Sequence, residues 1–475
     1  QNLTARSNRT QLIIKNPFMT SENTPSELSL SRWRGGSFVY RLVGLFYPWR
    51  EGSYLLQWAE PIGSIFIGLV LGLAPFVSST LVGVLLMAGA GYWAILTLSE
   101  RDQIAITPIH VLVLLYWGVA TVAVAFSPVK AEAFTGWVKL TLYLLWFALA
   151  ARVLRLPSLR NWTIALYLLI SLIISVYGIR QEIFGVEQLA TWNDPESELA
   201  EATRAYSYLG NPNLLAGYLI SAIALSISAL WVWRPWLQKG VALTALLVNT
   251  YCLYATDSRG GWIALVGLLT VYLLLLYYWY REALPQFWRI WLLPLVFAFF
   301  AGLLFAAIAL VEPLRLRVMS IFAGREDSSN NFRMTVWAAV LEMIRDYPWL
   351  GIGPGNDAFN QVYPLYQRPN YNALSAYSIY LEISVEMGMI GLSSFLALLA
   401  TIADQGWKKI TALKQLNNRE GFWIMGAIAA IIGMLTHGLV DTVWYRPEIS
   451  TLWWFMVAIV ASYYPAIAAS DKKSS

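Results

Sequence analysis

The sequence predicts an all-α polytopic membrane protein with about twelve transmembrane helices, an extracytoplasmic interfacial helix and a loop cap. Hydrophobic residues make up 58% of the 475 residues and charged residues only 13%, whereas about a quarter of an ordinary soluble domain is charged. Apolar stretches recur from residue 60 to residue 468 without a long linker. Lys and Arg gather between alternate pairs of these stretches. We therefore expect one membrane domain, with the lipid bilayer as its surroundings.

Twelve stretches are long enough to cross the bilayer, because a helix rises about 1.5 Å per residue across a hydrocarbon core of about 30 Å. The expected spans are 55–77, 79–98, 107–126, 137–154, 161–180, 212–233, 240–256, 260–280, 290–311, 378–402, 421–440 and 450–468. The domain boundaries follow from this count: a polar tail at 1–53, a single transmembrane domain at 54–468 and a short tail at 469–475.

The loop charges give the expected orientation, because short cytoplasmic loops carry an excess of Lys and Arg. The N-terminal tail and the even-numbered loops hold Arg32, Arg34, Arg41, Arg50, Arg152, Arg155, Arg160, Arg234, Lys239, Arg281, Arg289, Lys408, Lys409, Lys414 and Arg419. Lys472 and Lys473 lie in the C-terminal tail. We therefore expect both termini in the cytoplasm and the chain in the plasma (inner) membrane.

Two long connections, 181–211 and 312–377, are expected on the extracytoplasmic side. The first is acidic and rich in turn formers, as in a solvated loop. The second contains apolar residues at helical spacing, namely Trp337, Val340, Leu341 and Ile344. This spacing predicts an amphipathic helix over 333–346 that lies along the interface and ends before Pro348.

Composition also excludes several function classes. The net charge of +5 is small for this length, so nucleic acid is not an expected partner. The only cysteine is Cys252 and the only histidines are His110 and His437. We therefore expect no disulfide framework, no metal site and no cofactor. The first fifty or so residues lack the pattern of a secretory signal peptide.

Three arginines, Arg204, Arg259 and Arg333, interrupt apolar runs on the expected outer side. A guanidinium at a partly dry membrane boundary needs an anionic partner. Arg333 stands four residues before Trp337 on the apolar face of its helix, which points it inward. These arginines predict a shared anion or pyrophosphate site. The alternative is that they reach lipid headgroups or pair with acids such as Asp257.

Further polar residues accompany the arginines. Glu382 and Glu386 lie four apart on the tenth span and are candidate counter-charges, with proton coupling as the alternative. His437 precedes Asp441 by four residues, so it is either a base oriented by that carboxylate or a helix-end residue with an ordinary hydrogen bond.

Two short motifs are typical of turns. Asn211-Pro212-Asn213 fits a turn and helix cap that leads into the sixth span. The run GIGPG at 351–355 invites a phosphate-loop interpretation, but it follows a helix and lacks the Lys-Ser/Thr ending of a nucleotide loop. Turn formation is the preferred reading of both motifs.

Five ordered motifs carry a family resemblance. They are RAYSYLGNPNLLAGY at 204–218, SRGGWIAL at 258–265, RMTVWAAVLEMIRDYPWLGIGPG at 333–355, YLEISVEMGMIGL at 380–392 and HGLVDTVWYRPE at 437–448. From about residue 55 to its end, the chain resembles the O-antigen ligase and polymerase superfamily, and most closely its cyanobacterial IctB branch. The resemblance implies an O-antigen-ligase-like fold.

In the ligases, this resemblance implies metal-independent transfer of a glycan from an undecaprenyl pyrophosphate carrier. Arg204, Arg259 and Arg333 look like the arginines that grip the pyrophosphate. The family's catalytic histidine precedes the tyrosine-leucine-glutamate run, and this sequence has Tyr377 there. A phenol with a pKa of about 10 is a poor base at neutral pH. Unless His437 substitutes, the chain is expected not to act as an ordinary ligase.

Three functions follow from these observations. The IctB branch implies a role in inorganic-carbon accumulation, with bicarbonate as the transported ion. The second function is a lipid-linked glycan transferase that has changed its base, and the third is a non-catalytic protein that binds a lipid pyrophosphate or a partner. A transferase predicts a lipid-open cavity beside the arginines, whereas a transporter requires a route that opens to both sides.

Overall fold

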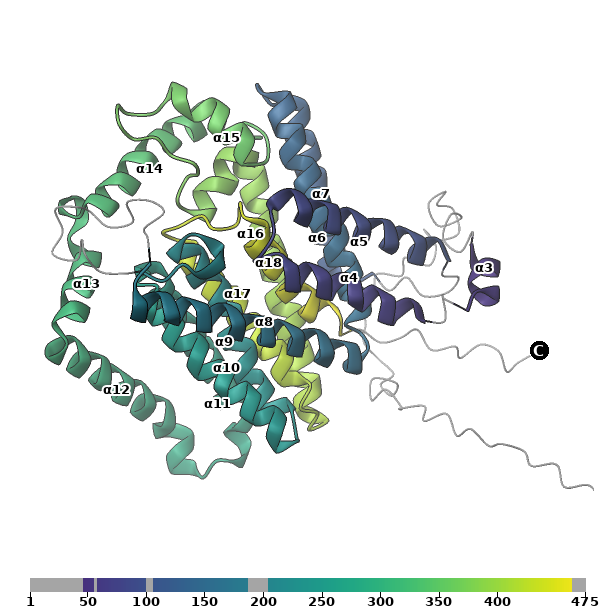
Figure 1. Ribbon diagram of the computed structural model, residues 1–475, viewed down its shortest axis with the longest axis vertical. Helices are drawn as coiled ribbons and strands as arrows, with labels where there is room; N and C mark the ends of the chain where they lie inside the picture. Colours follow the sequence, from purple (N-terminus) through teal and green to yellow (C-terminus); the bar gives the residue numbers. More distant parts are fainter. Residues whose placement is uncertain (1–45, 55–57, 100–105, 187–203, 464–475) are drawn as a thin grey trace, which may run out of the picture.

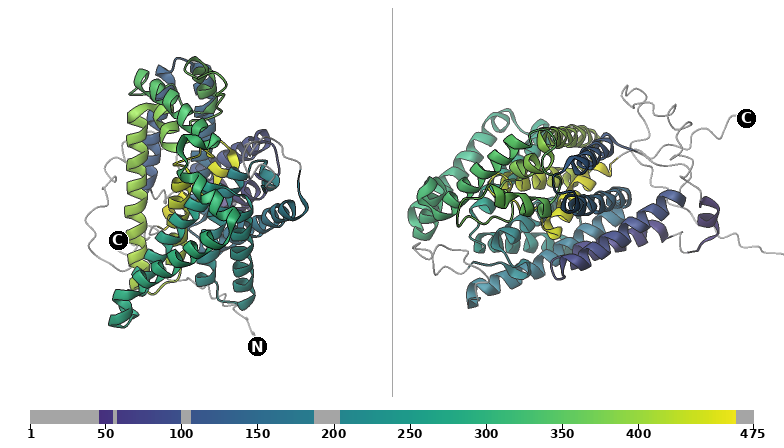
Figure 2. Two further views of the ribbon diagram at one scale, coloured as in Figure 1. Left: turned by 90° about the vertical axis from the view of Figure 1, so that its left-hand side faces the viewer. Right: turned by 90° about the horizontal axis from the view of Figure 1, so that it is seen from above.

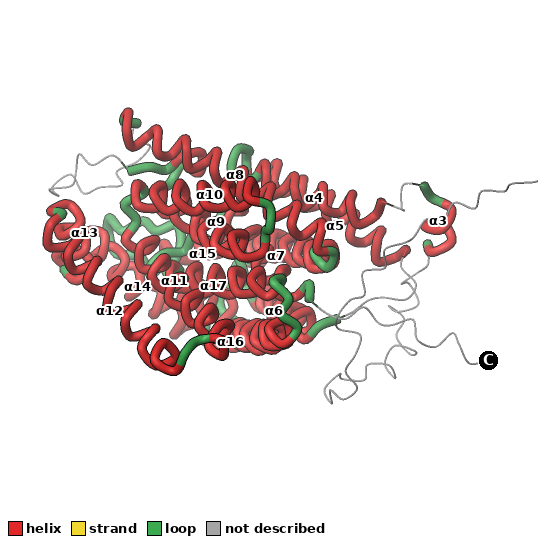
Figure 3. The backbone as a smooth tube through the Cα atoms, turned by 90° about the horizontal axis from the view of Figure 1, so that it is seen from below, coloured by secondary structure: helices red, strands yellow, loops and turns green. Residues whose placement is uncertain are grey.

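The computed structural model describes residues 46–54, 58–99, 106–186 and 204–463. Over these ranges the chain forms helices and loops and no strand (Figure 3). Eight of the described helices are long and apolar enough to cross a membrane. The predicted all-α membrane fold is therefore confirmed. The expected tail residues 1–45 and 469–475 lie outside the described ranges.

Each of the twelve expected spans coincides with a helix. These helices are α4 (Ala59–Leu73), α5 (Ser79–Ser99), α6 (Pro108–Phe126), α7 (Lys130–Val153), α8 (Pro157–Phe184), α9 (Pro212–Val232), α10 (Trp236–Ala255), α11 (Arg259–Tyr280), α12 (Gln286–Leu310), α16 (Ile379–Gln415), α17 (Gly421–His437) and α18 (Pro447–Ala461). A short helix, α3 (Tyr47–Gly52), precedes them. The largest differences in bounds are that α7 begins seven residues before the expected 137–154, α18 ends seven residues before the end of the expected 450–468, and α16 runs on beyond 378–402 to Gln415.

Three helices form the centre of the bundle. Most residues of α9, α17 and α18 are buried, and α17 packs along both α9 and α11. A helix that is apolar on all sides needs such an interior position. By contrast, α12 buries none of its residues. It runs along the edge of the molecule, at the lower left of Figure 1.

The second long connection is more helical than the sequence predicted. It contains α13 (Glu312–Phe322), α14 (Ser328–Asp346) and α15 (Asn356–Val362), with the short turns η5 (Gly324–Glu326) and η6 (Tyr363–Leu365). Figures 1 and 2 show α13 rising from the end of α12 to α14, which covers one end of the bundle with α15. These helices form the cap of the fold.

The expected helix at 333–346 is confirmed as part of α14, but its predicted apolar face is partly wrong. The residues buried against the cap core are Val336, Ala339, Val340 and Met343. Leu341 is 53% exposed. The buried face of α14 therefore differs from the predicted one, because Phe359 and Val385 of the cap core pack against the side that carries Val336 and Ala339.

The GIGPG run forms a tight turn that packs the cap onto the bundle. Gly353 and Gly355 adopt φ values of +105° and +102°, which L side chains rarely adopt. A Cβ added at Gly136 of α7 would lie 2.0 Å from the carbonyl oxygen of Pro354. Two backbones therefore meet without side chains between them, which agrees with the structural reading of this motif.

Candidate functional site

A cavity of about 1350 Å³ lies under the cap, where α9 and α11 begin. Its wall comes from η3 (Ser207–Leu209), the first turns of α9 and α11, the cap helices α13 and α14, the loop before α16 and the loop after α17. Five arginines line it, and we call it the arginine cavity: Arg204, Arg259, Arg317, Arg333 and Arg446. The structure thus brings the three arginines selected from the sequence into one hollow.

Arg204 is the most deeply placed of the arginines that the sequence singled out. Its Nε donates to the carbonyl oxygen of Thr256 at 3.1 Å, and its Nη2 lies 3.4 Å from Oδ1 of Asn213. Burial, followed by repulsion from Arg317, lowers the pKa of Arg204 to about 10. Positive charge is therefore crowded here, and a bound anion would relieve it.

Two ion pairs attach α13 and α14 to the start of α11. Arg259 donates to Asp327 at 3.0 Å and to both oxygens of Ser320 at 3.0 Å. Arg317 lies 3.1 Å from the carboxylate of Asp257 and donates to its backbone oxygen at 2.7 Å. Much of the hydrogen-bonding capacity of these two arginines is therefore used to hold the cap.

Asp257 itself sits in a left-handed backbone conformation, with φ of +50°. Burial raises the pKa of its carboxyl, although the neighbouring Arg317 and Arg204 act in the opposite direction. Its pairing partner is Arg317, which the sequence analysis did not include.

Arg333 retains more unused donors than Arg259 and Arg317. Its Nη1 donates to Oγ of Ser329 at 2.6 Å, one turn earlier in α14. Its Nη2 approaches Asp441 only to 4.0 Å, and its Nε is buried without a hydrogen-bond partner in the described chain. A buried donor without a partner costs free energy. This guanidinium is therefore suited to an added anion in the cavity.

Tyr377 lies on the cavity wall beside Asp441. Its φ of +49° is unusual for an aromatic residue, and such strain is concentrated at functional sites. Burial, followed by the charge of Asp441, raises the pKa of Tyr377 to about 12. The phenol therefore stays protonated at neutral pH, which strengthens the argument against Tyr377 as a base.

The two carboxylates of α16 do not act as counter-charges for the arginines. In the described ranges, neither Glu382 nor Glu386 forms an ion pair with an arginine. Instead, Oε2 of Glu382 accepts a hydrogen bond of 2.5 Å from the backbone N–H of Ala376. The expectation of pairing was wrong because the acid is used to hold the loop that carries Tyr377.

His437 and Asp441 do not form the expected pair either. Both ring nitrogens of His437 are buried without a hydrogen-bond partner in the described part of the chain. The imidazole lies behind Gly260, whose added Cβ would contact its Nε2 at 3.4 Å. Asp441 instead lines the cavity near Arg333. His437 therefore lies behind the cavity wall, and both readings of its hydrogen bond were wrong.

The two asparagines of the cap motif hold the backbone of the site. Asn211 caps α9, where its side chain accepts hydrogen bonds from the backbone N–H groups of Asn213 and Leu214. Asn213 in turn accepts a hydrogen bond of 2.8 Å from Oγ of Ser258, the cap residue of α11. The predicted helix cap is confirmed, and it links the start of α9, which contacts Arg204, to the start of α11, which carries Arg259.

Residues 242–396 match a family model described as O-antigen ligase. The match supports the O-antigen ligase superfamily. It covers Arg259, Arg317, Arg333 and Tyr377, so much of the arginine cavity falls within it. None of the curated proteins compared with the chain matches it. The family match supports a membrane family associated with glycosyl transfer, and it does not extend to the IctB branch or to bicarbonate transport.

Sequence reasoning missed two of the cavity arginines. Arg317 and Ile321 lie one turn apart in α13 and both face the cavity, while Met319 and Phe322 are 65% and 81% exposed. This amphipathic pattern was present in the sequence but was overlooked within a segment taken as loop. Arg446 belongs to the motif at 437–448, from which only His437 and Asp441 were selected as candidate site residues.

Proposed function

We propose that this chain is a membrane transferase that holds the pyrophosphate of an isoprenoid-linked glycan in the arginine cavity. The observation that carries the proposal is the convergence of five arginines on one hollow, with Arg333 still holding unused donors. A guanidinium can donate two parallel hydrogen bonds to phosphate. On this proposal the cavity faces the extracytoplasmic side, with Arg204, Arg259 and Arg333 as the principal ligand-binding residues.

Exposed apolar surfaces beside the cavity support an isoprenoid ligand. One side of the cavity is formed by α13, whose opposite face exposes Met319 and Phe322. This helix continues directly from α12, which is apolar and wholly unburied. The isoprenoid chain can stay in the lipid against the apolar side chains of α12 and α13 while its pyrophosphate reaches the arginines, because apolar groups are more stable away from water.

The proposed reaction transfers the glycan from the lipid pyrophosphate to an acceptor hydroxyl. An acceptor hydroxyl oxygen bonds to the anomeric carbon of the glycan as the bond from that carbon to the pyrophosphate oxygen breaks. The lipid pyrophosphate leaves with the bonding electrons, and the arginines stabilise its growing negative charge. The hydroxyl proton passes to a base. We assign that role to Asp441, because it lines the cavity, whereas Tyr377 is protonated and His437 lies behind Gly260.

Bicarbonate transport receives less support. Between the two ends of the bundle, α9, α11 and α17 are packed with buried side chains such as Ile220, Leu268 and Ile431. A transport route would have to cross this packed interior. The cavity of about 1350 Å³ also exceeds the roughly 300–1,000 Å³ of an ordinary small-ligand pocket, which suits a large amphiphile better than a small ion.

Two measurements test the proposal. Purified protein should bind undecaprenyl pyrophosphate more tightly than undecaprenol, which lacks the phosphates; equal affinity for the two lipids would contradict the pyrophosphate site. With an undecaprenyl-pyrophosphate-linked glycan in membranes that contain acceptors, the protein should release free lipid pyrophosphate.

The variant Asp441→Asn tests whether Asp441 is the base. Asp441→Asn should abolish release while binding persists, and release that survives this change would exclude Asp441 as the base. Asp357→Asn, at an exposed carboxylate paired with Lys139, is the matched control. Bicarbonate transport would be favoured instead if liposomes with the protein took up labelled bicarbonate and this uptake fell in an Arg204→Ala, Arg259→Ala double variant.

A further inference from the structure

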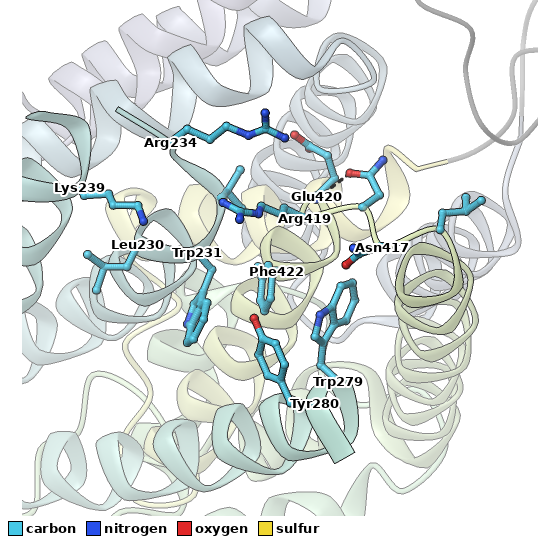
Figure 4. Close-up of a pocket in the computed structure, with 13 residues that line it drawn as sticks. Leu230, Trp231, Arg234, Lys239, Trp279, Tyr280, Asn417, Arg419, Glu420 and Phe422 are labelled. Atoms are coloured by element: carbon cyan, nitrogen blue, oxygen red, sulfur yellow. Dashed lines mark hydrogen bonds between the residues drawn. The ribbon is translucent and has the colours of Figure 1, made fainter. Parts of the chain in front are cut away.

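A second cavity, of about 830 Å³, lies at the opposite end of the same helices (Figure 4). It is lined by the last residues of α9 and α11, the start of α10, and the connection between α16 and α17. Its aromatic residues are Trp231, Trp279, Tyr280 and Phe422, and we call it the aromatic cavity. None of its lining residues belongs to the arginine cavity.

The length of α9 places the two cavities about one bilayer apart. This helix contributes its first residues to the arginine cavity and its last residues to the aromatic cavity. Its 21 residues span about 31 Å at about 1.5 Å per residue, which is close to the hydrocarbon thickness of about 30 Å. The aromatic cavity therefore lies at a lipid headgroup level.

Two aromatic side chains at the rim are placed as expected for such a level. Trp231 is 38% exposed and Tyr280 is 37% exposed. Their ring centroids are 5.5 Å apart, and both rings lie near that of Phe422. Tryptophan and tyrosine are enriched where hydrocarbon meets headgroups, because each has an apolar ring and a polar tip. The cavity thus has a packed aromatic floor beside the lipid.

Three cations line the cavity above this floor: Arg234, Lys239 and Arg419. All three are exposed, and none forms a hydrogen bond or an ion pair through its side chain within the described ranges. Figure 4 shows them coming from two separate segments: Arg234 and Lys239 come from the α9–α10 connection and the first turn of α10, and Arg419 comes from the connection between α16 and α17. Such an arrangement leaves the donors available to a ligand.

The one acidic residue of the cavity is already engaged. The carboxylate of Glu420 accepts a hydrogen bond from the buried Arg160 and another, of 3.1 Å, from the hydroxyl of Tyr463. The guanidinium of Arg160 also lies 4.1 Å from the centre of the Tyr463 ring. The charge of Glu420 is thus balanced from the protein side, and the cavity as a whole is positive.

We propose that the aromatic cavity binds the headgroup of an anionic phospholipid from the adjacent leaflet. The phosphate lies among Arg234, Lys239 and Arg419, and the glycerol and upper acyl chains lie against Trp231 and Tyr280. Charge complementarity and the depth of the cavity select this ligand, because a basic cluster at a bilayer surface attracts anionic lipid headgroups. The site is separate from the proposed pyrophosphate site.

Native mass spectrometry of the full chain in detergent can test this proposal with phosphatidylglycerol and phosphatidylcholine as probes. We expect preferential retention of phosphatidylglycerol, weakened about tenfold in the Arg234→Ala, Arg419→Ala double variant. The double lysine variant, Arg234→Lys with Arg419→Lys, should keep the preference because it keeps the charges. Arg281→Ala, which removes an exposed cation outside the cavity at the same end, should also keep it.

Three results would overturn the proposal: equal retention of the two lipids, an undiminished preference in the double alanine variant, or an equal loss in Arg281→Ala. Soluble glycerol 3-phosphate provides a further arm. If it displaces phosphatidylglycerol at comparable concentration, the ligand is a free phosphate compound and not a lipid.

Discussion

The two cavities differ in whether acidic side chains hold the cations that line them. In the arginine cavity, Arg259 and Arg317 are held by Asp327 and Asp257, and a helical cap covers the hollow. In the aromatic cavity, Arg234 and Arg419 are exposed, and neither binds an acid of the part of the chain that the structure describes. Donors fixed in advance favour charge that develops at a defined position. Exposed cations that no acid fixes in place favour a headgroup of variable position.

The difference extends to what lies behind each cavity. The aromatic cavity is backed by the buried pair of Arg160 and Glu420, which joins α8 to the start of α17. Behind the arginine cavity lies His437, whose ring nitrogens have no hydrogen-bond partner among the described residues, and the cavity wall includes the strained Tyr377. We infer that one end favours stability and the other maintains an arrangement suited to chemistry.

The largest expected effect is on the stable end. Arg160→Ala should lower the free energy of unfolding by about 3–5 kcal/mol, because it leaves the carboxylate of Glu420 without its buried partner. Thermal unfolding in detergent measures the change. Lys408→Ala, at an exposed pair with Asp404, should cost less than about 1 kcal/mol. Equal losses in the two variants would remove the contrast between buried and exposed pairs.

Arg333→Ala should have the next largest effect, on activity. Loss of a preorganised donor to the leaving pyrophosphate should reduce glycan release about 10²- to 10³-fold, or about 2.7–4 kcal/mol. Arg333→Lys should also reduce release, since an ammonium lacks the paired donors. Arg368→Ala, at an exposed arginine of the cap paired with Glu342, should leave release unchanged. A small loss in Arg333→Ala would place the pyrophosphate elsewhere.

The sequence predicted the helices and the shared arginine cavity better than it predicted the exact ends of the helices. The positions of the twelve helices were predictable, because crossing hydrocarbon demands long apolar stretches, and eight of the described helices are long and apolar enough to cross. The early start of α7 was not, since it includes Lys130 and Glu132, which hydropathy excludes from a span. The shared cavity of Arg204, Arg259 and Arg333 followed from placing their loops on one side of the membrane.

Partners of individual side chains were much less predictable. Asp257 pairs with Arg317 and Glu382 binds a backbone N–H, although both acids were considered as partners of the selected arginines. Helical spacing identified α14 but not its packed side, where Leu341 is exposed. Such details depend on which segments meet in the cap, and a one-dimensional pattern does not contain that information.

A third prediction concerns the cap, which only the arginine cavity has. Gly136→Ala should destabilise the protein by about 1–3 kcal/mol, because the new methyl group would meet the backbone of Pro354 and Gly355. Gly118→Ala is the control, since nothing lies within 4 Å of its added Cβ. Thermal unfolding compares the two. If Gly136→Ala were as stable as the control, the close contact between cap and bundle would be absent in solution.

The smallest expected effect is that of Tyr377→Phe on activity at neutral pH. Because its pKa is raised to about 12, the hydroxyl is protonated and supplies no base, so glycan release should change by less than about tenfold. The pH dependence of stability gives an independent measurement. Burial disfavours the phenolate in the folded state, so this stabilising contribution is complete below pH 10.0 and is lost as the pH rises to about 12. The wild type should therefore lose stability relative to Tyr377→Phe over that pH range. A large loss of glycan release in Tyr377→Phe at neutral pH would contradict the prediction and make Tyr377 a catalytic residue.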